Sequence, residues 1–251
     1  MINIKSPEEI EAMRRAGRVV AIMLREVVKA VRPGITTAEL DRVAEGVARA
    51  YGAVPAFKGF RGFPATLCTS VNSEVVHGIP GKRKLKEGDI ISIDTGAVVD
   101  GYYGDAAVTV PVGRVSPVAK KLIQVTQAAL AAGIRAAKVG AHVGDVSYAI
   151  QSVVESAGFS VVREYVGHGI GASMWEEPQV PNYGLPGVGP VLKAGMTLAI
   201  EPMVNVGSYE VVVMPDNWTV VTKDGSLSAH FEHTVLVTED GAQVLTSLEE
   251  E

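Results

Sequence analysis

The feature that most constrains the fold of this chain is an internal repeat. Residues 33–52, which run from a Pro-Gly pair to a single glycine, match residues 139–158 at an offset of 106. The strand-like segment that ends at Asp94 matches the segment that ends at Glu201 at an offset of 107. Chance aligns a few apolar positions more readily than it aligns helix ends and acidic positions in one order, so we interpret the matches as a structural repeat.

The sequence predicts that each half forms two helices followed by two strands that carry carboxylates. A weaker match sets Asp105 against Glu232. We expect one catalytic domain over residues 1–251, with two pseudo-symmetric halves at about 1–113 and 114–251 that share one sheet. The acidic residues of the four strands would then meet at the seam between the halves.

Cap residues predict where the helices begin. Ser6 and Glu9 form a capping box around Pro7, and apolar residues at helical spacing continue to Val31. Thr37 is the expected cap of the second helix. The further elements expected are helices over about 38–51, 117–138 and 145–158, and strands over 67–71, 161–166, 196–204, 211–214, 218–221 and 231–238.

Residues 89–110 read as two strands joined by Asp100-Gly101, a dipeptide that favours a two-residue type I′ turn. With this turn, Gly96 faces Asp105 across the hairpin, and Asp94 lies two residues further along the same face. The Cα atoms of the two aspartates would be roughly 7–8 Å apart. A register slip of one residue would instead put them on opposite faces.

Four carboxylates on apposed strands, those of Asp94, Asp105, Glu201 and Glu232, cannot all be buried as bare anions. Two divalent cations roughly 3.5–4 Å apart would resolve the repulsion and favour hydrolytic chemistry. His168, in a Gly-His-Gly-Ile-Gly segment, is a natural fifth ligand, and oxygen with imidazole suits Mn, Fe, Co or Zn. Two other interpretations stay open: aspartates on a solvated sheet face, and a purely structural histidine.

Composition narrows the class of protein. The chain is 47% hydrophobic, enough for a large core, and its net charge of −5 does not indicate broad binding to DNA or other nucleic acid. Its one cysteine, Cys68, excludes an internal disulfide, and nothing near it in sequence would activate it as a nucleophile. There is no signal core and no run near the roughly 20 apolar residues of a membrane span. We expect a cytoplasmic monomer that does not bind membranes.

Seven motifs are spread over nearly the full chain: Asn72–Pro80, Asp89–Asp94, Gly104–Ala107, Gly167–Gly171, Glu176–Gly184, Met196–Met203 and His230–Thr234. Together they resemble the pita-bread metallopeptidase family, and within it the bacterial type I methionine aminopeptidases. The resemblance implies an α+β fold in which a central, curved antiparallel sheet carries helices on its outer face. It also implies removal of the initiator methionine from nascent proteins and peptides.

The resemblance assigns roles to site residues. It implies two divalent metal ions per chain, bound by Asp94, Asp105, His168, Glu201 and Glu232. A metal-bridging water would attack the carbonyl after the N-terminal methionine, with Glu201 as general base. His77 would contact the substrate and help to stabilise the tetrahedral intermediate or the leaving nitrogen. A free α-amino group would bind a metal, which restricts the reaction to N-terminal residues.

The resemblance further implies an apolar pocket for the methionine side chain. A pocket lined by aromatic and sulfur-containing side chains suits a thioether. Without the resemblance, the aromatic residues would be interpreted as part of the hydrophobic core. The lining residues would be Phe57, Phe60, Phe63, Cys68, Met174 and Trp218.

One position departs from the family pattern. Trp175 stands where the family usually has a histidine that hydrogen-bonds the substrate near the scissile amide. An indole has one N–H donor and no titratable group, so it can donate a hydrogen bond but cannot shuttle a proton. Loss of one transition-state donor often lowers turnover on the order of 10²-fold.

Other functions remain as alternatives. One is another pita-bread enzyme, such as a proline-specific peptidase or a creatine-type amidinohydrolase, or a homologue with weakened activity on other N-terminal residues. Another is a peptide-binding protein without activity, which the complete ligand set disfavours and Trp175 keeps open. A basic run, Lys82-Arg83-Lys84 with Lys86, suggests transient contact with the ribosome, although a solvated basic loop is the commoner interpretation.

Overall fold

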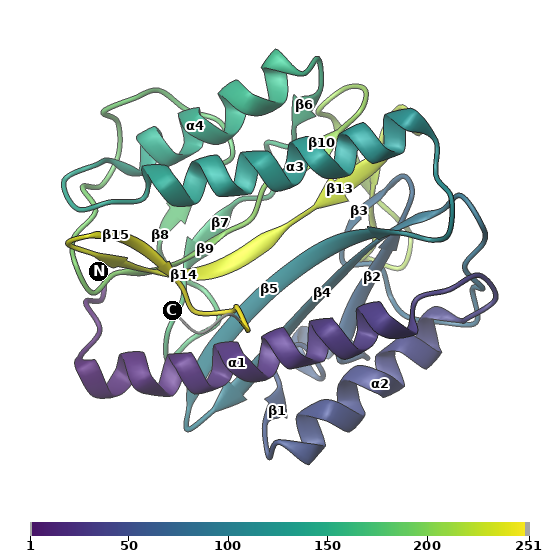
Figure 1. Ribbon diagram of the computed structural model, residues 1–251, viewed down its shortest axis with the longest axis horizontal. Coiled ribbons are helices and arrows are strands. Elements are labelled where there is room, and N and C mark those ends of the chain that lie inside the picture. Colours follow the sequence, from purple (N-terminus) through teal and green to yellow (C-terminus); the bar gives the residue numbers. More distant parts are fainter. Residues whose placement is uncertain (1, 249–251) are drawn as a thin grey trace.

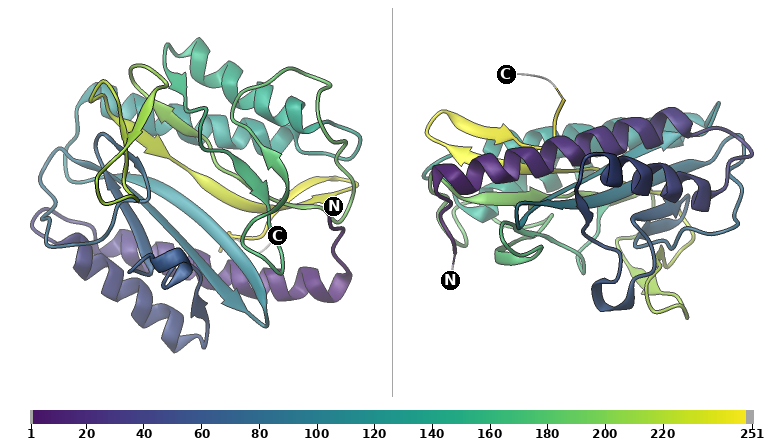
Figure 2. Two further views of the ribbon diagram at one scale, coloured as in Figure 1. Left: turned by 180° about the vertical axis from the view of Figure 1, so that it is seen from behind. Right: turned by 90° about the horizontal axis from the view of Figure 1, so that it is seen from below.

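The computed structural model describes residues 2–248, and its four long helices lie on one face of a curved main sheet (Figure 1). Seen from behind, the sheet lies in front of the helices, and seen from below, several loops project from the side away from them (Figure 2). No helix among the described residues is long and apolar enough to cross a membrane. The helices are α1 (Pro7–Ala30), α2 (Thr37–Ala50), α3 (Pro117–Ala136) and α4 (Val143–Ser156), with a short 3₁₀ turn at Phe60–Gly62.

The main sheet has nine strands, all antiparallel, in the order β1-β4-β5-β14-β9-β7-β8, with β15 paired to β14 and β2 paired to β4. Its strands are β1 (Val54–Pro55), β2 (Leu67–Val71), β4 (Ile90–Val99), β5 (Tyr102–Pro111), β7 (Gly167–Gly169), β8 (Glu176–Val180), β9 (Thr197–Ile200), β14 (Glu232–Thr238) and β15 (Gly241–Val244). The pairing of β5 with β14 joins strands from the two halves of the expected repeat.

Two small sheets flank the main one. The first has the order β13-β10-β6 and the second β11-β12-β3. Their strands are β3 (Glu74–Val76), β6 (Ser160–Val161), β10 (Met203–Asn205), β11 (Val211–Val213), β12 (Val220–Thr222) and β13 (Ser228–His230).

Each helix pair buries an apolar cluster against its own strands. One cluster joins α1, α2 and the β2–β5 region through residues such as Met23, Leu40 and Ile91. The other joins α3, α4 and the second-half strands through residues such as Leu122 and Ile150. Fully burying such side chains contributes about 1.5–3 kcal/mol each, which fixes the sheet beneath the helices and leaves its opposite face for a site.

The local signals place most element ends correctly. Ser6 and Glu9 form the capping box of α1, and Ser116 caps α3. The hairpin turns at Asp100-Gly101, and Gly96 pairs with Asp105 as the two-residue turn requires. The predicted register of the central hairpin is therefore confirmed.

Some expected bounds are wrong. Thr36 rather than Thr37 caps α2, because its side chain accepts a hydrogen bond from the backbone N–H of Glu39. The strand expected over 161–166 stops at Val161.

Two other expected strands are shorter or divided. The strand expected over 196–204 is split after Ile200, where Pro202 has no N–H to continue the pairing. The strand expected from Trp218 begins at Val220, because the Asp216 carboxylate accepts the N–H groups of Trp218 and Thr219 and holds them in a turn.

Candidate metal centre and substrate pocket

The register of the main sheet puts the acidic residues on one face. Asp94 on β4 lies opposite Cys68 on β2 and opposite Ala107 on β5. Ala107 in turn lies opposite Glu232 on β14. Paired residues point to the same face, as do residues two apart along a strand, so Asp105 also points this way.

His168 and Glu201 reach this face from the second half. His168 on β7 pairs with Ala199 on β9, and Ala199 pairs with Thr234 on β14. Since Thr234 lies two residues after Glu232, His168 shares the face of Glu232. Glu201 comes two residues after Ala199. The Nε2 atom of His168 lies 3.5 Å from Oε1 of Glu201.

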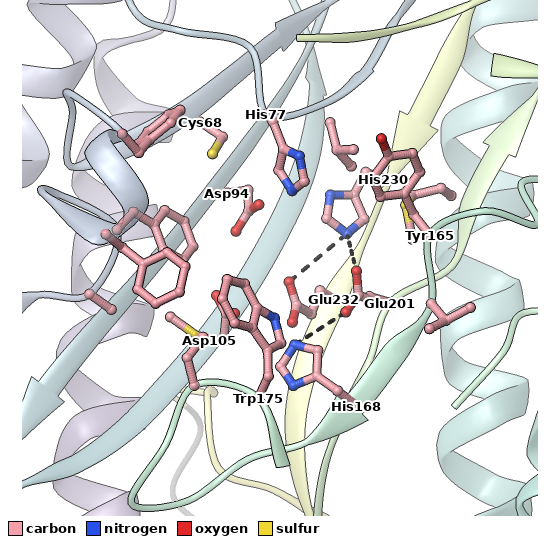
Figure 3. Close-up of a pocket in the computed structure, with 18 of the residues that line it drawn as sticks. Cys68, His77, Asp94, Asp105, Tyr165, His168, Trp175, Glu201, His230 and Glu232 are labelled. Carbon is pink, nitrogen blue, oxygen red and sulfur yellow. Dashed lines mark ion pairs between the residues drawn. The ribbon is translucent and has the colours of Figure 1, made fainter. Parts of the chain in front are cut away.

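A pocket of about 300 Å³ opens over this face, and all twelve residues proposed for the site line it. Figure 3 shows the carboxylates and His168 pointing into one cavity, with Trp175 beside them. The apolar part of the lining contains Phe57, Phe60, Phe63, Cys68, Met174 and Trp218. The structure thus brings the predicted residues together, while their individual roles stay predictions.

Burial makes the ionised form of these acids costly. It raises the pKa of Asp94 to about 7. Burial, and after it the charges of neighbouring acids, raises the pKa values of Asp105, Glu201 and Glu232 well above their usual range. A site with this many buried acids holds them as anions only when positive charge is placed among them.

The cluster fits divalent metal ions. Within residues 2–248, one oxygen each of Asp94, Asp105 and Glu232 is buried without a hydrogen-bond partner. Ligand atoms of Asp105, His168 and Glu232 lie within 4.8 Å of one another. The Nδ1 atom of His168 contacts the carbonyl oxygen of Gly169 at 2.8 Å, which leaves Nε2 to face the acids. Unpaired carboxylate oxygens and an imidazole nitrogen form a donor set that suits Mn, Fe, Co or Zn.

His77 is held against the cluster by aromatic neighbours. Its φ of 61° lies in the left-handed region, which is uncommon for residues other than glycine and is often found at functional sites. Its ring packs edge-on against Tyr165 at 5.6 Å and Trp218 at 6.5 Å. Burial lowers its pKa to about 4, so the imidazole is neutral at pH 7 and carries one N–H donor.

Trp175 stands beside the cluster of acids and His168 (Figure 3) and is half-exposed at 50%. Its ring lies 6.2 Å from the ring of His168 and packs edge-on against Phe60 at 4.6 Å. The guanidinium of Arg61 lies over both the Phe60 and the Trp175 rings, at 5.4 Å and 5.8 Å. The indole of Trp175 thus lies beside His168, a predicted metal ligand. This is the position at which the chain departs from the family pattern.

Three polar residues of the pocket, Glu164, Tyr165 and His230, have no role predicted from the sequence. The signal for His230 was present, because it precedes Glu232 by two residues and so lies on the same face of an extended chain. Tyr165 gave no such signal, since it lies in the segment where the expected strand does not form.

With this geometry in place, comparison with known proteins assigns the class. The family model for metallopeptidase family M24 matches residues 11–239. The chain therefore belongs to the M24 metallopeptidases.

Two similar proteins carry the name methionine aminopeptidase. The chain is 55% identical over 246 residues to methionine aminopeptidase 1 of Bacillus subtilis, covering 98% of this chain and 99% of that one. It is 54% identical to the crystal structure of methionine aminopeptidase from Thermotoga maritima, with a TM-score of 0.97 over 98% of this chain and 100% of that one.

More distant structures share the fold alone. The prolidase of Pyrococcus horikoshii aligns with a TM-score of 0.80 at 23% identity, over 99% of this chain and 64% of that one. Together with the curved sheet and its outer helices, these neighbours confirm the predicted α+β pita-bread fold.

Proposed function

We propose that this chain is a methionine aminopeptidase that hydrolyses the peptide bond after an N-terminal methionine. The observation that carries the proposal is the arrangement of one pocket: an apolar, sulfur-containing wall ends at a largely buried cluster of four carboxylates and an imidazole. A thioether side chain fits the first part, and metal-assisted hydrolysis fits the second. The relatives that are more than half identical to this chain carry this name.

The metal ligands in this proposal are Asp94, Asp105, His168, Glu201 and Glu232. Two divalent ions of Co, Mn, Fe or Zn, when bound, supply Lewis acidity and lower the pKa of water. Glu201 takes up the proton of the attacking water at its carboxylate, because it faces the pocket beside His168.

His77 is the proposed contact to the reacting amide. Its neutral imidazole donates an N–H hydrogen bond to the substrate carbonyl as negative charge develops there. The contacts with Tyr165 and Trp218 hold the ring in place. The aromatic wall orients the methionine side chain, so that the scissile carbonyl lies between His77 and Glu201.

Release of free methionine from the peptide Met-Ala-Ser tests this function. The metal-loaded chain is expected to release methionine from Met-Ala-Ser, and removal of metal by a chelator is expected to abolish the release, with recovery on adding Co²⁺ or Mn²⁺. Acetyl-Met-Ala-Ser is the matched control, because it lacks the free α-amino group. Binding of metal without any cleavage of Met-Ala-Ser would contradict the proposal and favour a peptide-binding protein.

The alternative of a homologue with altered or lost peptidase activity is not favoured. Relatives at 55% and 54% identity over nearly the whole chain carry the name methionine aminopeptidase, whereas the prolidases match at 23–24% and show the fold alone. We then expect Trp175 to affect the rate of the proposed reaction and not its type.

The proposed substrates are N-terminal methionyl peptides and nascent chains, which places the reaction in the cytoplasm. The active form that we propose is a monomer, whose pocket holds all twelve proposed site residues. Transient contact with the ribosome would use the basic loop. Lys82, Lys84 and Lys86 are exposed there and form no ion pair within residues 2–248, while Arg83 pairs with Glu74 at 2.8 Å.

Charge reversal of Lys82, Lys84 and Lys86 to glutamate is expected to abolish co-sedimentation with ribosomes at low salt, because the exposed ammonium groups would face anionic RNA. Release of methionine from Met-Ala-Ser is expected to stay unchanged, because the loop lies outside the pocket lining. Unchanged co-sedimentation of the triple variant would remove the loop as the contact.

A further inference from the structure

His230 is the one buried imidazole of the pocket to which the reaction proposed above assigns no role. It is 2% exposed, and its Nε2 atom has no hydrogen-bond partner within residues 2–248. This atom lies 3.9 Å from Oε2 of Glu201 and 3.9 Å from Oε2 of Glu232 (Figure 3). A buried polar atom without a partner calls for an explanation.

The position of His230 is firmly set. Its backbone N–H donates to the hydroxyl of Thr109 at 2.8 Å, and that hydroxyl donates to the backbone carbonyl of His230 at 2.8 Å. Its Cα pairs with that of Met203 between β13 and β10. The ring is therefore aimed at the acids by a fixed backbone.

The separation of 3.9 Å fits a cation better than a hydrogen bond. An N–H···O hydrogen bond ends near 3.2 Å between heavy atoms. Two metal–ligand bonds to imidazole nitrogen and carboxylate oxygen, at about 2.0–2.2 Å each, span up to about 4.2 Å. A divalent ion thus fits between Nε2 of His230 and either carboxylate.

Glu201 lies between two imidazoles. Its Oε1 faces Nε2 of His168 at 3.5 Å, and its Oε2 faces Nε2 of His230 at 3.9 Å. We propose that His230 is a sixth protein ligand of the metal centre, so that the centre holds its cations with two imidazole nitrogens in place of one. This inference rests on the proposed dinuclear centre. A second nitrogen favours Co, Fe or Zn over Mg or Mn.

Co²⁺ alone, added to the full chain, is the probe. Proton NMR of a paramagnetic Co²⁺ protein resolves the exchangeable ring N–H of each ligating histidine. We expect two such signals in the wild-type protein, and one after His230→Gln. We also expect His230→Gln to weaken the affinity for one Co²⁺ equivalent by 10-fold or more in a calorimetric titration, with a smaller change for Mn²⁺.

His233→Gln is the matched control. His233 follows Glu232 on β14 and is partly buried, but it points to the opposite face of the main sheet, where Nδ1 contacts the hydroxyl of Thr246 at 2.9 Å. This variant is expected to keep both signals. One exchangeable signal in Co²⁺-loaded wild-type protein overturns the inference and leaves the proposed function standing, whereas no bound Co²⁺ overturns both. The number of exchangeable signals in the wild-type spectrum tests the proposal even if a variant fails to fold.

Discussion

Replacement of Glu201 by glutamine is expected to lower kcat/KM for Met-Ala-Ser by about 10³-fold, the size of effect associated with a general base. Glutamine keeps the shape of the side chain and removes its capacity to accept the proton of the attacking water. The carboxylate of Glu201 lies in the pocket with both oxygens near imidazoles. The measurement is the rate of methionine release at saturating Co²⁺.

Glu177→Gln is the control for the change in charge. Glu177 is an exposed residue of β8, outside the pocket lining, and this variant should keep the wild-type rate. A Glu201→Gln variant that releases methionine at the wild-type rate would contradict the role of Glu201 as base. Metal content measured on the same samples separates the loss of the base from the loss of a ligand.

Trp175→His is expected to raise kcat for Met-Ala-Ser on the order of 10²-fold, because it restores a ring that can donate to the scissile amide and exchange a proton. The indole ring lies 6.2 Å from the ring of His168, so an imidazole at this position would lie beside the proposed metal centre. KM is expected to change little, since the hydrogen bond strengthens mainly in the transition state.

A second substitution at this position separates donation from packing. Trp175→Phe keeps an aromatic ring for the contact with Phe60 at 4.6 Å but has no N–H, so its kcat should be equal to or below that of wild type. Equal rates for wild type and Trp175→His would show that this side chain has no part in the chemistry.

The carboxylate cluster could be predicted because strand geometry is local. The turn at Asp100-Gly101 fixes the register of the hairpin, and the register fixes that Asp94 and Asp105 share a face. The repeat then placed Glu201 and Glu232 on equivalent strands. Helix caps could also be predicted from the sequence. The cap of α2 was placed one residue too late, at Thr37 instead of Thr36, because the two adjacent threonines are both suitable cap residues.

Features that depend on tertiary contacts were not predicted. The two small sheets pair segments distant in sequence, such as β3 with β12 and β6 with β10, and no local pattern specifies those partners. His230 was within a recognised motif, yet its lack of a partner appears only when the second half folds over β5 and places its Nε2 between two carboxylates.

The two parts of the pocket, the acidic cluster and the apolar wall, differ in how far the sequence predicts them. The proposed methionine-binding wall combines residues from segments around Phe57, Cys68, Met174 and Trp218, which lie far apart in the sequence and meet only in the folded chain. Its composition was implied by resemblance to a family, whereas the convergence of the acids followed from strand register.

The central claim is that acids from both halves of the repeat hold two cations at one place. The most direct measurement is anomalous diffraction at the metal edge from crystals of the full chain grown with excess Co²⁺. We expect two peaks roughly 3.5–4 Å apart, enclosed by Asp94, Asp105, His168, Glu201 and Glu232. A single peak, or none at this cluster, would contradict the account.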